Sequence, residues 1–227
     1  MESRDTRKRN SSVTYGYMRR NLFVCGFLLA ATVAYGQSSD DFHKYNLWLG
    51  LGPAIPTGNS TNYLSAAPLF GFGFGYRFDK YFQADAGMQI AFGAANNSSA
   101  VQTNLGPVQG GDHEYMVPLG GRVYLPLPSD RFSVSVGGGA AYLHYSETAP
   151  SGGYYSTQCY TCTARGGWGG YGLAEADYYL DSNHNFKVGT IVQYIAGTTN
   201  GPAVGNVPAN STKDHWLNVM FDFGFSF

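Results

Sequence analysis

The sequence is poor in charged residues and in cysteine, and beyond its first 36 residues it has no long apolar run. It contains 14 Lys+Arg, 15 Asp+Glu and 3 Cys among 227 residues. Without a run of about 18 apolar residues, helical membrane spans are excluded after the N-terminal region. The scarce basic residues form no stripe, which argues against nucleic acid as a partner.

The sequence is instead rich in glycine and aromatic residues, with 31 Gly, 18 Tyr and 15 Phe. This mixture favours strands and turns. The mean hydropathy of −0.20 is intermediate. A barrel wall in a membrane has such a mean, because residues facing lipid alternate with residues facing a polar interior.

The N-terminus has the pattern of an export signal. Met18, Arg19 and Arg20 form a basic start, residues 22–33 an apolar core, and small residues precede Gln37. We therefore expect translation to start at Met18 and cleavage to follow residue 36. Residues 37–43 are then a short periplasmic lead, and residues 44–227 form the folded unit.

Eight segments of the remaining chain alternate at period two between an apolar or aromatic set and a small or polar set, which is typical of strands. The predicted strands are Lys44–Gly52, Leu69–Phe78, Tyr81–Phe92, His113–Leu125, Arg131–Tyr145, Trp168–Leu180, Phe186–Ala196 and His215–Phe227. In the fifth, the run Gly137–Gly139 suggests a bulge or bend.

The connections alternate in length. Those at Pro53–Pro68, Gly93–Asp112, Ser146–Gly167 and Gly197–Asp214 are long, and those at Asp79–Lys80, Pro126–Asp130 and Asp181–Asn185 are short. Bacterial outer-membrane barrels have tight periplasmic turns and longer external loops. The sequence therefore predicts an all-β fold: a closed, antiparallel, up-and-down transmembrane β-barrel of about eight strands in the bacterial outer membrane.

A soluble, lipocalin-like barrel is the main alternative, since it would point the apolar set inward around a ligand cavity. The set opposite the aromatic one is charged, and comprises Arg77, Asp85, Arg122, Glu175, Asp177, Lys187 and Asp222. A soluble protein could not easily expose the aromatic face to water. The pattern therefore favours lipid outside and charge inside.

The C-terminal segment alternates apolar residues and closes on phenylalanine, with Phe223, Phe225 and Phe227 on one face. With this ending, the region Lys44–Phe227 resembles the small outer-membrane β-barrel family that includes opacity-type proteins and the transmembrane domain of OmpA-like proteins. The resemblance implies that the barrel-assembly machinery recognises these three side chains. It supports the fold better than any particular function.

The inward charges have two interpretations. An interior network of ion pairs would fill the lumen, because an eight-stranded barrel is just wide enough for side chains and unpaired charge is costly there. Alternatively, the pairs would gate a narrow path for ions or small solutes. Neither interpretation requires a cofactor or a metal.

The motif Cys159-Tyr160-Thr161-Cys162 lies in the third long connection. In an exported protein we expect a local disulfide. A labile redox pair or a metal site is the alternative, although no second motif of this spacing exists for a zinc site.

His144 and Ser146 are two residues apart and so share one strand face. A serine activated by histidine can transfer acyl groups. The spacing is similar to the His-x-Ser of outer-membrane lipid A deacylases, but Glu147 replaces that family's Asn. The alternative is a histidine and a serine at the barrel rim.

We expect no enzymatic activity but a passive role in envelope structure or in surface interaction through four external loops. Tyr154, Tyr155 and Tyr160 either offer a recognition surface for an external ligand or pack on the barrel rim. A small-solute channel and a lipid A esterase are the two alternatives.

Overall fold

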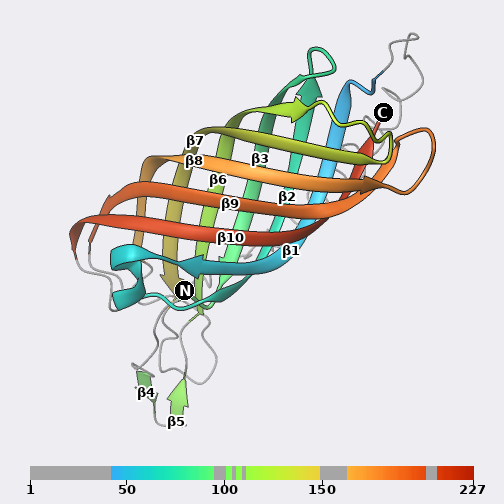
Figure 1. Cartoon of the computed structure of the whole chain (residues 1–227). Coiled ribbons are helices and arrows are strands. Elements are labelled where there is room, and N and C mark those ends of the chain that lie inside the picture. The colour runs from blue at the N-terminus through green and yellow to red at the C-terminus, as the bar shows by residue number, and fades with distance from the viewer. Residues whose placement is uncertain (1–41, 95–100, 104–105, 109–110, 149–162, 203–208) are drawn as a thin grey trace, which may run out of the picture. The chain divides into compact units, whose positions relative to one another are not determined.

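Eight strands close into a single antiparallel barrel, with strands tilted around its axis (Figure 1). The computed structural model describes residues 42–94, 101–103, 106–108, 111–148, 163–202 and 209–227. Around the barrel the order is β1-β10-β9-β8-β7-β6-β3-β2. The strands are β1 Tyr45–Pro56, β2 Ala67–Arg77, β3 Phe82–Phe92, β6 Gly111–Leu125, β7 Phe132–Thr148, β8 Thr163–Tyr179, β9 Phe186–Gly201 and β10 Asn210–Ser226.

Three short elements lie in the long connections. The 3-10 helix η1, Gly58–Asn62, follows β1, and β4 (Val101–Thr103) pairs with β5 (Gly106–Val108) between β3 and β6. The sequence pattern gave no sign of these elements. Within the described residues, no helix is long and apolar enough to span a membrane.

The first and last strands close the barrel. Leu47 is opposite Phe225 and Leu51 is opposite Phe221 in the β1–β10 pairing. The backbone N–H of Tyr45 donates to the carbonyl of Phe227 at 2.8 Å, and the N–H of Phe227 donates to Tyr45 at 2.9 Å. Closure leaves the barrel without an open sheet edge, as a membrane requires.

The predicted strand count is confirmed, but the outer strand ends were predicted too short. β1 continues to Pro56, β8 begins at Thr163, and β9 and β10 reach Gly201 and Asn210. The predicted long connections Pro53–Pro68, Ser146–Gly167 and Gly197–Asp214 are therefore wrong in extent. The extensions of β8, β9 and β10 are rich in Thr, Gly and Asn, so they lack the apolar alternation that marks the membrane-embedded part.

The expected bulge at Gly137–Gly139 is wrong. These three glycines pair in unbroken register with Arg122, Gly121 and Gly120 of β6. A Cβ on Gly139 would lie 2.3 Å from the Leu119 carbonyl oxygen. The glycines therefore allow two strands to approach closely without interrupting the ladder.

The outer face of the barrel is apolar. Leu51 is 64% exposed and Phe221 63%, and Phe72, Phe74 and Phe223 are also exposed. Because the charged set lies inside and the aromatic set outside, the lipocalin-like alternative is excluded. Such a surface is stable in lipid and not in water.

Candidate functional site: the barrel interior

A chain of ion pairs crosses the lumen in the half of the barrel that faces the short turns. Arg122 on β6 donates from Nε to Asp85 on β3 at 2.7 Å and also pairs with Glu175 on β8. Lys187 on β9 pairs with Glu175 and donates to Asp177 Oδ2 at 2.7 Å. We call these five residues, together with Asp222, the charged layer.

The members of the charged layer come from strands that are not all neighbours. Arg122 reaches Glu175 past β7, which presents the small Ser135 and Gly137 between them. Every residue of the charged layer except Asp85 is at most 3% exposed. Mutual pairing offsets the cost of removing these charges from water.

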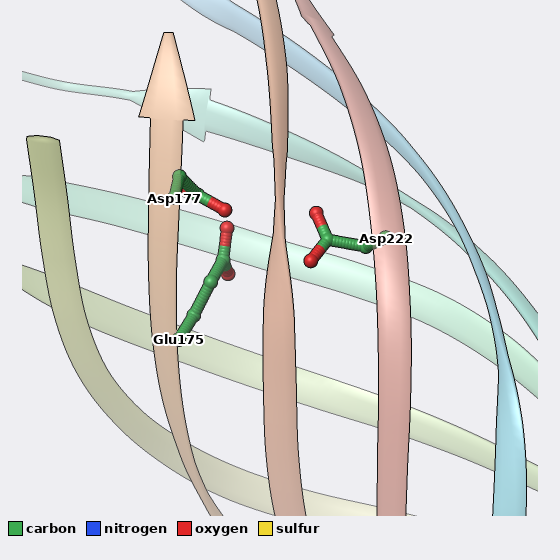
Figure 2. Close-up of side chains that lie close together, drawn as sticks. All are labelled: Glu175, Asp177 and Asp222. Carbon is green, nitrogen blue, oxygen red and sulfur yellow. The ribbon is translucent and has the colours of Figure 1, made fainter. Parts of the chain in front are cut away.

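Two of the predicted inward charges do not join the ion pairs. Arg77 places its guanidinium 3.7 Å from the centre of the Tyr124 ring, in a cation–π contact. Asp222 is fully buried on β10, and neither of its oxygens has a hydrogen-bond partner among the described residues. Figure 2 shows its carboxylate pointing towards those of Glu175 and Asp177.

One carboxylate oxygen from each of Glu175, Asp177 and Asp222 lies within 4.8 Å of the others, a spacing that could hold a metal ion (Figure 2). The sequence analysis expected no metal site. The alternation showed that these residues face inward but could not show their distance from one another.

A neutral hydrogen-bond network lies beside the charged layer, close to the chain ends. Ser226 donates to Asn46 at 2.6 Å, and Asn46 donates to Gln83 at 3.0 Å. Tyr124 donates to the same Gln83 oxygen at 3.0 Å, and Gln83 donates to Asp85 at 2.6 Å. The network therefore connects the β1–β10 closure to the ion pairs.

The middle of the lumen is filled by large side chains. Trp48, Met116, Trp216 and Met220 are buried there with aliphatic residues such as Leu143, Ile191 and Ile195. Gln89 bridges this layer, since it donates to Gln193 at 2.6 Å and accepts from Asn218 at 2.7 Å. The sequence analysis expected a mainly polar interior and did not assign Trp48 or Trp216 to it.

One cavity lies between the middle and the charged layer, lined among others by Trp48, Gln89, Arg122 and Tyr171. Its volume is about 10 Å³. A cavity needs about 10–15 Å³ to hold one water molecule. This cavity therefore holds about one water molecule at most.

A second polar cluster lies in the other half of the lumen. Arg165 donates to the Thr199 carbonyl at 3.1 Å and contacts the Thr212 hydroxyl, while Thr199 donates to Asp214. Tyr63, beyond β1, donates to Asp214 at 3.0 Å. Burial and the Asp214 carboxylate raise the pKa of the Tyr63 hydroxyl. None of these residues was predicted, because their segments were assigned to loops or strand ends.

His144 and Ser146 lie on the outer face of β7. His144 stacks on Tyr142, with ring centres 6.4 Å apart, and lies beside Tyr115. No hydrogen bond joins His144 to Ser146 among the contacts of the described residues. Their surroundings are an aromatic rim, to which Trp168 also belongs.

The remaining predicted residues lie at the last strand or outside the described residues. Phe225 stacks on Phe227 at 5.3 Å, Phe227 stacks on Tyr45, and Phe223 faces outward on β10. Cys159 and Cys162 fall outside the described residues, as does the expected export signal in residues 1–36, so both expectations stay predictions.

Comparison with solved structures finds the same fold in small outer-membrane proteins. The chain is similar to Neisserial surface protein A, with a TM-score of 0.52 and 12% identity over 81% of this chain and 97% of that one. It also aligns with OprG from Pseudomonas aeruginosa, at a TM-score of 0.46 and 14% identity over 84% and 99%. Ail, the attachment invasion locus protein of Yersinia pestis, gives 0.45 and 10% over 81% and 99%.

No family model and no curated protein matches the sequence. At these identities the likeness to solved structures shows the fold alone. The closed barrel, its apolar exterior and this likeness define a class: the described unit is a small, eight-stranded β-barrel of the bacterial outer membrane.

Proposed function

We propose that this protein is a non-conducting barrel that anchors its external connections at the cell surface, where they serve envelope structure or surface interaction. The observation that carries the proposal is the filled lumen. Trp216 and Met220 are fully buried in its centre, and the charged layer crosses it closer to the short turns. A path for solutes would require both layers to open.

In this proposal the barrel is the anchor, and the external connections are the part presented at the cell surface. The outward apolar residues hold the barrel in lipid, and the packed interior makes it rigid. Loops on a rigid scaffold are the usual location of binding residues. We further propose that the barrel-assembly machinery recognises Phe223, Phe225 and Phe227, as expected from the resemblance.

Conductance in planar bilayers tests the closed lumen. Wild-type protein should give no stepwise current, and a variant that replaces both Trp48 and Trp216 by alanine should still give none, because the ion pairs of the charged layer continue to cross the lumen. Folding of both proteins is checked by heat-dependent migration in gels. Regular steps from the wild type would instead establish a channel.

Surface interaction is tested by shortening the connection that contains Tyr154, Tyr155 and Tyr160. Binding of whole cells to host-cell or matrix surfaces should fall, while the amount of folded barrel stays the same. A variant changed instead in the short turn at Pro126–Asp130 serves as control, because that turn faces the opposite side of the membrane. Release of fatty acid from lipid A that is lost in Ser146→Ala would contradict the passive role.

A further inference from the structure

Asp222 is a buried acidic group that the ion pairs of the charged layer do not include. Its side chain is fully buried, and neither carboxylate oxygen has a partner among the described residues. It points towards Glu175 and Asp177 across β9 (Figure 2). A buried carboxylate without a partner is strongly unfavourable, so a compensating positive charge is expected beside it.

A glycine lets the two carboxylates approach each other. Gly189 on β9 pairs with Asp177 on one side and with Asp222 on the other. A Cβ at Gly189 would lie 2.2 Å from Asp177 Oδ1 and 3.0 Å from Asp222 Oδ1. Any larger residue would therefore displace the two carboxylates from the gap they share.

The ion pairs leave free three oxygens at this gap, one of Asp177 and both of Asp222, whereas both oxygens of Glu175 are used, one by Lys187 and one by Arg122. Lys187 takes Glu175 Oε1 and Asp177 Oδ2. Asp177 Oδ1 and both oxygens of Asp222 have no hydrogen-bond partner among the described residues. The charged layer thus holds four carboxylates, of Asp85, Glu175, Asp177 and Asp222, against the two cations of Arg122 and Lys187.

We infer that Asp222 and Asp177, with Glu175 beside them, bind a hard divalent cation of the calcium class inside the barrel. Its two positive charges would balance the two excess carboxylates. Calcium binds carboxylate oxygens at about 2.3–2.6 Å, so ligand atoms up to about 5 Å apart can share one ion. The observed 4.8 Å limit for the three carboxylates fits this span. The inference does not depend on whether the barrel conducts.

Calcium binding to the folded, detergent-solubilised full-length protein tests the inference. The protein is stripped with EDTA and titrated with calcium chloride in a calorimeter. We expect saturable binding of one ion per chain. Asp222→Asn should weaken binding by at least about tenfold, since even the loss of an outer partner of a metal ligand costs about 10- to 100-fold.

Glu114→Gln is the matched control, because it also neutralises a buried carboxylate of the lumen, but one that lines the cluster with Arg165 and Asp214. It should bind calcium as the wild type does. Without calcium, Asp222→Asn should fold at least as stably as the wild type, because it removes the uncompensated charge. If it gives no folded band, Asp177→Asn takes its place with the same expected loss.

Two results would overturn the inference. The first is no calcium binding by the wild type, which would mean that a proton on Asp222 provides the compensation. The second is binding of unchanged affinity in both Asp222→Asn and Asp177→Asn, which would place the ion in the external connections or the detergent layer.

Discussion

At the scale of single residues, the energetics of the interior depend on which charges have partners. Lys187 contacts two carboxylates, those of Glu175 and Asp177. Burial makes each of these contacts matter, because water has little access to replace a lost partner. Exposed charges in the turns lack this dependence.

Lys187→Met is therefore expected to lower the free energy of unfolding by about 3–5 kcal/mol, the usual cost of breaking a buried ion pair from one side. Urea unfolding followed by tryptophan fluorescence measures the change. Lys80→Met is the control, since Lys80 is exposed and its interaction among the described residues is with the Tyr81 ring, at 5.0 Å, which is worth at most about 1 kcal/mol. Equal losses in the two variants would contradict the role of the charged layer.

Asp181 shows a different use of a carboxylate, in the turn between β8 and β9. The backbone N–H of Phe186 donates to it at 2.8 Å, and the backbone and side chain of Asn185 donate at 3.2 Å and 3.1 Å. These hydrogen bonds, with that of Phe186 the largest contribution, lower the pKa of Asp181. The charged form therefore stabilises the turn.

The lowered pKa of Asp181 makes the stability of the folded protein depend on pH, and it fixes the direction of that dependence. Because the folded-state pKa is lowered, the contribution of Asp181 is complete above the ordinary aspartate pKa and is lost as the pH falls through the lowered value. Asp181→Asn should reduce the midpoint of urea unfolding at neutral pH and have no effect on it at strongly acid pH. A difference between wild type and variant that stays constant over the acid range would contradict this assignment.

At the scale of elements, the inward glycines of β2 and β3 form a slot for one side chain of β1. A Cβ on Gly73 would lie 2.5 Å from the Trp48 ring, and on Gly71 or Gly87 it would lie 3.1 Å and 3.2 Å away. The Phe-Gly alternation of this strand predicted which face points inward. It could not predict that glycine makes room for Trp48, because that contact depends on the register between two strands.

Gly73→Ala should accordingly lower the free energy of unfolding by about 1–3 kcal/mol through overpacking. In a Trp48→Leu background the same change should cost much less, with a coupling energy of about 0.5–3 kcal/mol. Urea unfolding of the four proteins completes the cycle. Gly170→Ala is the control, since its Cβ would meet only the Gly139 carbonyl oxygen, at 3.6 Å. Additive losses would show that the slot is not the cause.

The sequence predicted strands well where one face meets lipid and poorly elsewhere. β2 and β10 alternate throughout the membrane-embedded part, and their faces are as predicted. The outer ends, such as Thr198–Gly201 of β9, pair as strands but carry no apolar set. Alternation arises from contact with lipid, so it ends where the lipid ends although the ladder continues.

At the scale of the whole molecule, the interior has layers that no single segment encodes. Alternation identified Arg122 and Glu175 as inward residues, but their contact depends on barrel closure and on the small residues of β7 between them. That Asp222 has no hydrogen-bond partner among the described residues is likewise a property of the closed barrel. Trp216 and Met220 lie on the same inward face of β10 as Asp222. Because both are apolar, the alternation of apolar and polar residues did not identify them as inward.

The apolar exterior is the property on which membrane insertion depends, and its centre can be tested directly. Phe221 is 63% exposed and lies opposite Leu51, midway along β1. Phe221→Arg should lower the free energy of unfolding in lipid vesicles by about 2–4 kcal/mol, because an arginine at the bilayer midplane faces hydrocarbon. Phe78→Arg is the matched control. Phe78 is as exposed, at 65%, but follows β2 at a short turn, where the cost should be about 0–1 kcal/mol. Equal costs at the two positions would mean that the hydrocarbon is not centred on Phe221, and no cost at either would contradict an exterior that faces lipid.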